Sequence, residues 1–239
     1  MVKFGNFIFK YRNVIFPLFF VVLVVFTGPP QGSEKFAKYR YLIGIAVAFT
    51  GQAIRAMTIG LAYIVRGGRD RKVYAKALVK DGIFSHCRNP LYLGNILIVL
   101  GLGIIAHSIP FYIIGIPFFL FMYLAIIMAE EDFLRGKFGE EYVEYCRNVN
   151  RFIPNMSGIG KTIGSMTFNW GRLIIKEYGT TYTWVICVIL LILKNHYLQY
   201  GREQSEGAFL VSSVLLIIAT SLYAVARFLK KSGRLTDKH

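Results

Sequence analysis

The sequence has few charged residues and few cysteines for its length. Charged side chains make up 17% of its 239 residues, whereas an ordinary soluble domain carries about 25%. The three cysteines, Cys87, Cys146 and Cys187, form no CxxC pair and lack the histidine spacing of a zinc site. We therefore expect neither a disulfide framework nor a metal site.

Several common nucleotide-binding and hydrolase motifs are also missing. No GxxxxGK[ST], HExxH or GxSxG pattern occurs in the chain. Gly101 and Gly103 do flank a leucine, but they lie inside an apolar run and follow no predicted strand. This pair is therefore no dinucleotide-binding loop.

Apolar residues dominate instead. They make up 55% of the chain, and the mean hydropathy is +0.49. Five runs are long or apolar enough to enter a bilayer, and one more is marginal. The predicted spans are about 14–27, 41–65, 92–106, 111–128, 182–200 and 208–228. We predict an all-α fold, a polytopic bundle of about six transmembrane helices.

The third and fourth spans are predicted to form a helical hairpin. Residues 92–106 give only about 23 Å of helix at 1.5 Å per residue, which is short for a full crossing. Pro110 follows and breaks the helix before the next apolar run. The hairpin returns the chain to the side of the membrane that it left.

The first apolar run has two interpretations. It follows Lys3, Lys10 and Arg12, as the apolar core of a signal peptide follows a basic segment. However, the residues after it, 28–32, read Gly-Pro-Pro-Gln-Gly and offer no A-x-A cleavage site. We therefore predict a retained helix.

The formal net charge of +15 is concentrated on one side of the predicted topology. Of the 28 Lys and Arg residues, 22 lie in the termini, loop 66–91 and segment 129–181. Such a bias predicts a multi-pass membrane protein with cytoplasmic N- and C-termini. We expect the lipid bilayer, with its anionic cytoplasmic leaflet, and not nucleic acid as the partner of this charge.

The chain divides into two predicted parts. Residues 1–155 form a core that contains the first four spans and an amphipathic helix at 131–150, lying on the protein or the cytoplasmic membrane surface. The apolar face of this helix consists of Leu134, Phe138, Tyr142 and Tyr145. Residues 156–239 are predicted to be a linker, with a short interfacial helix, followed by two extra C-terminal spans.

Arg55 lies in the middle of the second predicted span. An arginine at this depth is costly and usually faces a partner or a watery cavity. Snorkelling to the inner end would have to bridge about 15 Å. We therefore predict an internal role, structural or functional.

The third span begins at Arg88-Asn89-Pro90. One reading is structural, because Asn is a strong N-cap, Pro suits the first helical turn and Arg binds lipid phosphate. The other reading is functional, because the same turn offers a guanidinium group and helix-start amides to an anionic ligand. The residues alone leave both readings open.

Glu130 and Glu131 follow the hairpin, on the side where Arg88 and Tyr92 precede it. The two stretches are therefore predicted to meet at one membrane depth. The glutamates are either solvated carboxylates at the interface or ligands for an ammonium or for sugar hydroxyls. Phe84 and Tyr92 offer aromatic faces to a flat ring or a cation.

Together these pieces resemble the isoprenylcysteine carboxyl methyltransferase and phospholipid methyltransferase superfamily of integral membrane enzymes. Residues 88–94 match its pattern R-[HN]-P-x-Y-x-G. Residues 130–145 match E-E-x-x-L-x-x-x-F-G-x-x-Y-x-x-Y after the hairpin, and residues 51–55 match G-x-x-[IL]-R. The resemblance covers roughly residues 42–154 and leaves the last two spans outside it.

The resemblance implies S-adenosylmethionine as methyl donor and a lipid-soluble or amphiphilic acceptor with a carboxylate, amine or thiol group. It implies that Arg88 or the helix-start amides meet the methionine carboxylate and that Glu130 meets an ammonium or hydroxyls. The implied cofactor-binding residues are Lys76, Ala77, Leu78, Val79, Phe84, Arg88, Asn89, Pro90, Leu91, Tyr92, Glu130 and Glu131. The candidate catalytic residues are Arg88, Asn89, Glu130 and Arg55.

Two positions depart from the family pattern. Many relatives have His where this chain has Asn89, and an amide is no general base at neutral pH. Isoprenylcysteine enzymes of eukaryotes have an Arg at the position of Ile126, which argues against a prenylated cysteine as the acceptor. An NADPH-dependent membrane reductase of the sterol-reductase type and a non-catalytic membrane protein that retains the fold remain as alternatives.

Overall fold

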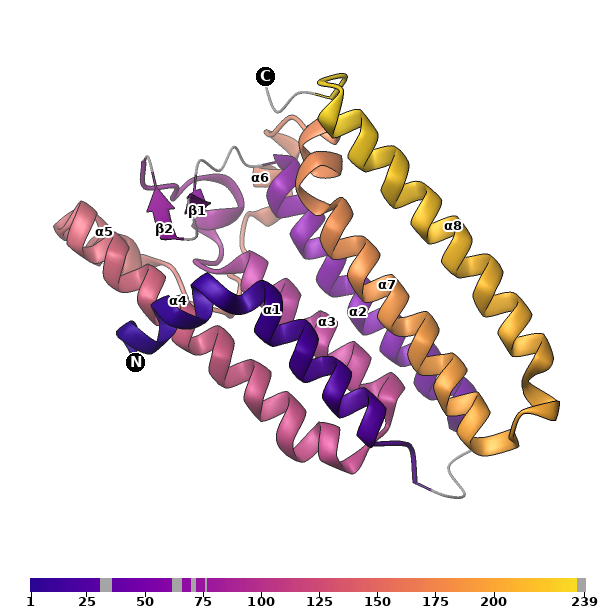
Figure 1. Ribbon diagram of the computed structural model, residues 1–239. Helices are drawn as coiled ribbons and strands as arrows, with labels where there is room; N and C mark the ends of the chain where they lie inside the picture. Colours follow the sequence, from indigo (N-terminus) through magenta and orange to yellow (C-terminus); the bar gives the residue numbers. More distant parts are fainter. Residues whose placement is uncertain (31–35, 62–65, 70–71, 76, 236–239) are drawn as a thin grey trace.

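The computed structural model describes residues 1–30, 36–61, 66–69, 72–75 and 77–235, and these form a bundle of long antiparallel helices (Figure 1). The long helices are α1 (Val2–Phe26), α2 (Ala37–Leu61), α3 (Pro90–Ala106), α4 (Ile116–Phe138), α7 (Trp170–Tyr200) and α8 (Glu206–Lys231). The short ones are η2 (Gly82–Ser85), η3 (Phe111–Gly115), α5 (Glu140–Asn148), α6 (Ile159–Gly164) and η4 (Glu203–Ser205). Strands β1 (Arg66–Arg69) and β2 (Lys72–Ala75) form an antiparallel pair with Arg66 opposite Ala75.

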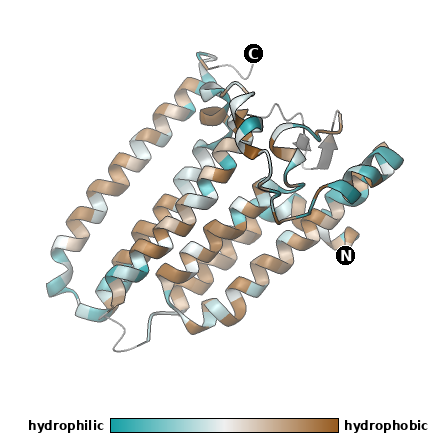
Figure 2. Ribbon diagram, turned by 180° about the vertical axis from the view of Figure 1, so that it is seen from behind, coloured by the Kyte–Doolittle hydropathy of each residue, from teal (hydrophilic) through white to brown (hydrophobic). Residues whose placement is uncertain are grey.

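The predicted class of fold is confirmed. Within the described ranges, five helices are long and apolar enough to cross a membrane, and α3 is a shorter apolar helix of 17 residues. Apolar residues run along these helices, whereas α5 and the ends of the bundle are hydrophilic (Figure 2). The protein is therefore an integral membrane protein with a polytopic helical bundle. The small β1–β2 hairpin is an addition that the sequence did not predict.

The region after the hairpin differs from its prediction. The helix expected at 131–150 is not separate from the span, because α4 continues without a break from Ile116 to Phe138. Gly139, with φ of +53°, then ends α4 and precedes α5. A backbone in this region of φ favours glycine, which has no Cβ to clash.

The linker predicted at 156–181 is also partly helical. The short helix expected there is α6. However, α7 begins at Trp170, earlier than the predicted span at 182–200. Asn169 starts this helix, because its side chain accepts a hydrogen bond of 2.8 Å from the backbone N–H of Arg172.

The helix directions gather the polar segments at one end of the bundle, which we call the site end. Helices α1, α3 and α7 begin there, and α2, α4 and α8 run back towards it, so the start of α1 and the end of α8 lie there, as do β1, β2, α5 and α6 (Figure 1). The turns from α3 to η3 and from α7 to α8 lie at the opposite end. This arrangement brings the turn before α3 level with the second half of α4.

Helices α2 and α3 approach closely through two pairs of glycines. Gly44 lies against Gly101, and Gly51 lies against Gly94, so the spacing is seven residues on each helix. A Cβ added to Gly101 would lie 2.5 Å from the carbonyl oxygen of Gly44, and one added to Gly51 would lie 2.5 Å from that of Gly94. Small residues let helix backbones pack in this way within a membrane.

We expect Gly101→Ala to lower stability by about 1–3 kcal/mol, the usual cost of overpacking, because its methyl group meets backbone that cannot rotate away. Thermal unfolding in detergent would measure the loss. Gly207→Ala in α8 is the matched control, since an added Cβ there meets nothing within 4 Å. Equal melting temperatures for the two variants would contradict the close approach of α2 and α3.

Candidate functional site

A cavity of about 830 Å³ lies within the bundle, among α1, α3, α4 and α7. Its polar end is lined by Arg12, Arg88, Asn89, Tyr92 and Glu130. Towards the opposite end it continues as an apolar limb, which is lined by Phe20, Val21, Ile98, Val99, Leu102 and Phe119. The lining residues of α3 recur at intervals of three and four, so one face of the helix forms this wall.

The polar end is built where the start of α3 meets α4. The Tyr92 hydroxyl donates a hydrogen bond of 2.7 Å to Glu130 Oε1. Asn89 Nδ2 donates to Glu131 Oε1 at 3.4 Å, and Arg88 Nη2 lies 3.8 Å from the same oxygen. The prediction that the hairpin brings these two stretches together is confirmed.

Asn89 does not act as a side-chain cap. It occupies the N-cap position of α3 but makes no capping hydrogen bond, because its amide donates to Glu131 Oε1 and to the backbone oxygen of Arg151, at 3.4 Å each. Pro90 starts the helix with a fixed φ. Asn89 thus has the predicted N-cap position without the side-chain capping hydrogen bond, and the position predicted for Pro90 is confirmed.

Two buried polar atoms beside the cavity lack a partner among the described residues. They are Arg88 Nε and Asn89 Oδ1, a donor and an acceptor on neighbouring residues that both line the cavity. Leaving such a group unsatisfied costs about 1–3 kcal/mol. An unsatisfied pair in a native site calls for an explanation, and a ligand that both accepts and donates hydrogen bonds supplies one.

Glu131 has a different environment from Glu130. Its carboxylate accepts hydrogen bonds from Arg151 at 2.6 Å (Nη2) and 3.1 Å (Nε), in addition to the contact with Asn89. The hydrogen bond with Glu131 raises the pKa of Arg151, so this guanidinium stays charged. Glu130 lines the cavity, and Glu131 is not among the described residues of its wall. Glu131 therefore holds segment 149–155 against the start of α3.

The internal position predicted for Arg55 is confirmed, and its partner is Glu177 in α7. Arg55 Nη2 lies 2.6 Å from Glu177 Oε1, and Arg55 Nε donates to Oε2 at 2.8 Å. Its Nη1 donates to Asn95 Oδ1 at 2.7 Å and to the backbone oxygen of Leu91 at 3.3 Å. Arg55 thus connects α7 to the first turns of α3 and also lines the cavity.

Two further side chains complete this buried network. Gln52 Nε2 donates to Glu177 Oε2 at 3.2 Å, and Trp184 Nε1 donates to Gln52 Oε1 at 3.0 Å. Sequence reasoning missed Glu177 and Trp184 as partners. Glu177 lay within the predicted linker. The pattern that could have revealed it is an acid seven residues before a tryptophan, a spacing that places both on one face of a helix.

The aromatic part of the predicted site is only partly at the cavity. Phe84 is 3% exposed and lines the cavity, and its backbone oxygen accepts a hydrogen bond of 2.7 Å from the Tyr145 hydroxyl. Pro90 and Leu91 also line the cavity. Leu78 instead packs against a separate hydrophobic cluster that contains Leu134, Tyr142 and Tyr145.

The remaining cofactor-binding candidates lie elsewhere. Among the described residues, the cavity wall does not include Ala77, Leu78 or Val79. Lys76 lies outside the part of the chain that the structure describes.

Residues 39–141 match the sequence profile of the family described as phospholipid methyltransferase. This segment belongs to the phospholipid methyltransferase family. The family is one of membrane methyltransferases within the isoprenylcysteine carboxyl methyltransferase-like superfamily, as the sequence motifs predicted. The matched segment contains most of α2 and all of α3 and α4, whereas α1, α7 and α8 lie outside it.

Two relatives of the chain are named as metal resistance proteins. The cobalt-zinc-cadmium resistance protein CzcN of Cupriavidus metallidurans is 34% identical over 116 residues, which is 48% of each chain. The nickel-cobalt-cadmium resistance protein NccN of Alcaligenes xylosoxydans xylosoxydans is 30% identical over 141 residues, 57% of this chain and 61% of the relative. The match therefore spans about half the length of these relatives. No solved structure matches the chain.

Proposed function

We propose that the protein transfers a methyl group from S-adenosylmethionine to a lipid-soluble or amphiphilic acceptor. The observation that carries this proposal is the meeting of the Arg88-Asn89-Pro90 turn and Glu130 at the polar end of a cavity within a membrane bundle. The segment that builds this meeting belongs to a family of membrane methyltransferases.

The residues present fit the cofactor. Arg88 Nε and the first-turn amides of α3 suit a carboxylate, since a helix start favours anions. Glu130 and Asn89 Oδ1 suit an ammonium or hydroxyls, and Phe84 and Tyr92 offer aromatic faces. When bound, S-adenosylmethionine supplies a methyl group on a positively charged sulfur.

The chain's own contribution is alignment rather than proton removal. Asn89 cannot serve as a base at neutral pH. We therefore propose an acceptor that is already a nucleophile, such as a carboxylate, an amine or a thiolate, because transfer to it needs mainly an in-line geometry. Ile126 lines the cavity as an apolar group and adds no charge towards the acceptor.

We propose that the two reactants arrive from different phases. In this proposal the site end and both termini face the cytoplasm, where the cofactor is dissolved, and the excess of Lys and Arg in the termini, loop 66–91 and segment 129–181 supports this orientation. The acceptor arrives from the bilayer, between α1 and α7. Val21, which is 54% exposed, and the exposed Thr183 both line the cavity at this side.

Calorimetry on the purified protein in detergent tests the proposal. We expect S-adenosylmethionine and S-adenosylhomocysteine to bind with dissociation constants in the millimolar range or below. No binding at millimolar concentration would refute a methyltransferase. Tighter binding of NADPH that displaces S-adenosylmethionine would support the reductase alternative instead.

A role in metal tolerance is a second candidate, and the names of the two relatives favour it. In the described part of the chain, no group of three His, Cys, Asp or Glu residues is placed to hold a metal ion. We propose that such a role would depend on methyl transfer. A host that lacks the gene should then regain growth on cobalt, zinc or cadmium with the wild-type gene but not with a Glu130→Gln gene.

A further inference from the structure

The cavity has two walls of different origin. The lining residues of α2, α3 and α4 belong to the segment of the phospholipid methyltransferase family. The opposite wall is formed by α1, α7 and one residue of α8, Tyr223, which lie outside that segment. The second wall is therefore where this chain can select its own ligand.

The wall from α1 carries a cation at the polar end. Arg12 is half-buried, and its guanidinium lies 4.1 Å from the centre of the Phe9 ring. The other arginines of the cavity face acids, Arg55 at 2.6 Å from Glu177 and Arg88 at 3.8 Å from Glu131. Among the described residues, no acid lies within 4.0 Å of Arg12. Arg12 is thus the cavity cation whose charge the described chain leaves unneutralised.

A second polar group stands beside Arg12 on the same wall. Asn13 lines the cavity, and Pro17 follows it four residues later on the same helical face. Proline has no N–H, so the backbone oxygen of Asn13 loses its usual helical partner. The α1 wall therefore changes from polar at Arg12 and Asn13 to apolar at Phe20 and Val21.

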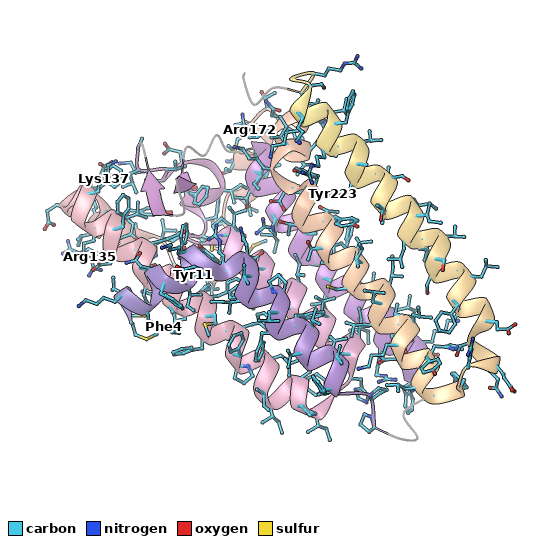
Figure 3. All side chains as sticks on the ribbon, viewed as in Figure 1. Phe4, Tyr11, Arg135, Lys137, Arg172 and Tyr223 are labelled. Atoms are coloured by element: carbon cyan, nitrogen blue, oxygen red, sulfur yellow. The ribbon has the colours of Figure 1, made fainter. Side chains whose placement is uncertain are left out.

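The wall from α7 and α8 includes several small side chains, and aromatic contacts join the two helices. Gly179, Thr180 and Thr183 line the cavity with small side chains, and the Thr183 hydroxyl is satisfied by the Gly179 oxygen at 2.9 Å. Tyr223 of α8 points to α7, where its ring centre lies 5.2 Å from that of Tyr178 and 4.5 Å from that of Tyr182 (Figure 3). These contacts fix α8 behind the groove.

The groove between α1 and α7 is closed at the far end. There Lys194 of α7 donates hydrogen bonds to the backbone oxygens of Val24 and Thr27 at the end of α1. Nearer the site end, the exposed Val21 and Thr183 border the groove on its lipid side. The lining of α3 from Pro90 to Leu102 gives the cavity a length of about 18 Å at 1.5 Å per residue.

We infer that the α1–α7 groove binds an anionic amphiphile, with its phosphate or carboxylate group at Arg12 and Asn13 and a hydrocarbon chain in the apolar limb. Charge complementarity selects the head group, because Arg12 lines the cavity and no acid of the described ranges lies within 4.0 Å of it. The opening of the groove to the lipid and its apolar lining favour a hydrocarbon chain as the other end of the ligand. That this ligand is also the methyl acceptor rests on the proposed function, but its binding does not require the cofactor.

Fluorescence quenching tests the inference without cofactor. Trp184 lines the cavity and Trp170 is 69% exposed, so a Trp170→Phe background leaves Trp184 as the reporter of the two tryptophans. The protein is placed in phosphatidylcholine nanodiscs that contain increasing fractions of phosphatidic acid with brominated chains. We expect saturable quenching at a mole fraction at least tenfold lower than with brominated phosphatidylcholine. Equal quenching by both lipids would overturn the inference.

Matched variants locate the site. Arg12→Gln should raise the half-saturating fraction about tenfold or more, as expected for loss of a charge-assisted hydrogen bond, and Arg12→Lys should recover part of the affinity. Lys10→Gln is the control, because Lys10 is an exposed cation two residues away. Thr183→Phe should block the groove, whereas Leu190→Phe, at a residue of α7 that is 45% exposed, should not. Equal effects of the Arg12 and Lys10 variants would overturn the inference.

Competition separates the sources of the anion. Dodecyl phosphate should relieve the quenching, whereas inorganic phosphate at the same concentration should not. Relief by inorganic phosphate alone would show a free-phosphate site and overturn the inference. Loss of S-adenosylmethionine binding with intact lipid quenching would refute the proposed function alone, and the reverse result would refute the groove alone.

Discussion

Arg55→Leu should lower the stability of the protein by about 3–5 kcal/mol, because it leaves the carboxylate of Glu177 buried without its partner. Glu177 is 2% exposed, and both its oxygens accept hydrogen bonds from Arg55. The loss also frees Asn95 and the Leu91 oxygen at the start of α3. Thermal and chemical unfolding in detergent would measure the change.

The double variant Arg55→Leu/Glu177→Leu separates a stranded charge from lost packing. Replacing both members of a buried ion pair by apolar groups is often nearly neutral, so the second substitution should restore most of the lost stability. Glu141→Gln is the control for removing an acid, because Glu141 pairs with Lys80 while both side chains are about half exposed. That control should cost no more than about 1 kcal/mol. A double variant as unstable as Arg55→Leu would contradict the paired network.

The same ion pair gives the C-terminal helices a place in the site. Glu177 lies in α7, outside the family segment, while Arg55 and Leu91 lie inside it. The position of the Arg55 guanidinium depends on Glu177 of α7, and the hydrogen bonds of Arg55 to the first turns of α3 depend on that position. This coupling explains why a bundle with a family-like core retains a charged pair at a depth where charges are expensive.

The meeting of the two main motifs could be predicted because topology alone determines it. A helical hairpin that returns to its starting side must bring its two ends to one depth, so the turn at Arg88 and the glutamates of α4 had to be neighbours. Which of the adjacent residues Glu130 and Glu131 faces the cavity could not be predicted in this way. Adjacent helical residues point about 100° apart, and only the packing of α4 decides which of them faces the cavity.

The partners of the buried charged residues could not be predicted from the sequence for another reason. Arg151 lies in a segment without helical or strand periodicity, so nothing in its pattern connected it to Glu131. Glu177 lies in a mixed stretch between Gly171 and Gly179 that reads as a loop, because its charges lower the local hydropathy. In the structure it lies within α7, where it pairs with Arg55.

Glu130→Gln should weaken binding of S-adenosylmethionine by about 1.5–3 kcal/mol, the scale of a hydrogen bond to a charged group, and leave stability almost unchanged. Glu130 lines the cavity and accepts from the Tyr92 hydroxyl, a contact that the amide oxygen of Gln can retain. Calorimetry on the variant, beside its melting temperature, would measure both quantities. Unchanged affinity would return Glu130 to the interpretation of a carboxylate without a ligand.

The neighbouring substitution Glu131→Gln is the matched control and should give the opposite result. The Glu131 carboxylate pairs with Arg151 and accepts a hydrogen bond from Asn89. In the Gln variant, the amide NH₂ group would face hydrogen-bond donors of these residues. We expect a loss of stability of about 1–3 kcal/mol, with a smaller effect on cofactor affinity than Glu130→Gln causes. The two variants carry the same chemical change one residue apart, so their difference reports which side of α4 faces the cofactor. If Glu131→Gln weakened cofactor binding more and left the melting temperature unchanged, the assignment of the two carboxylates would be reversed.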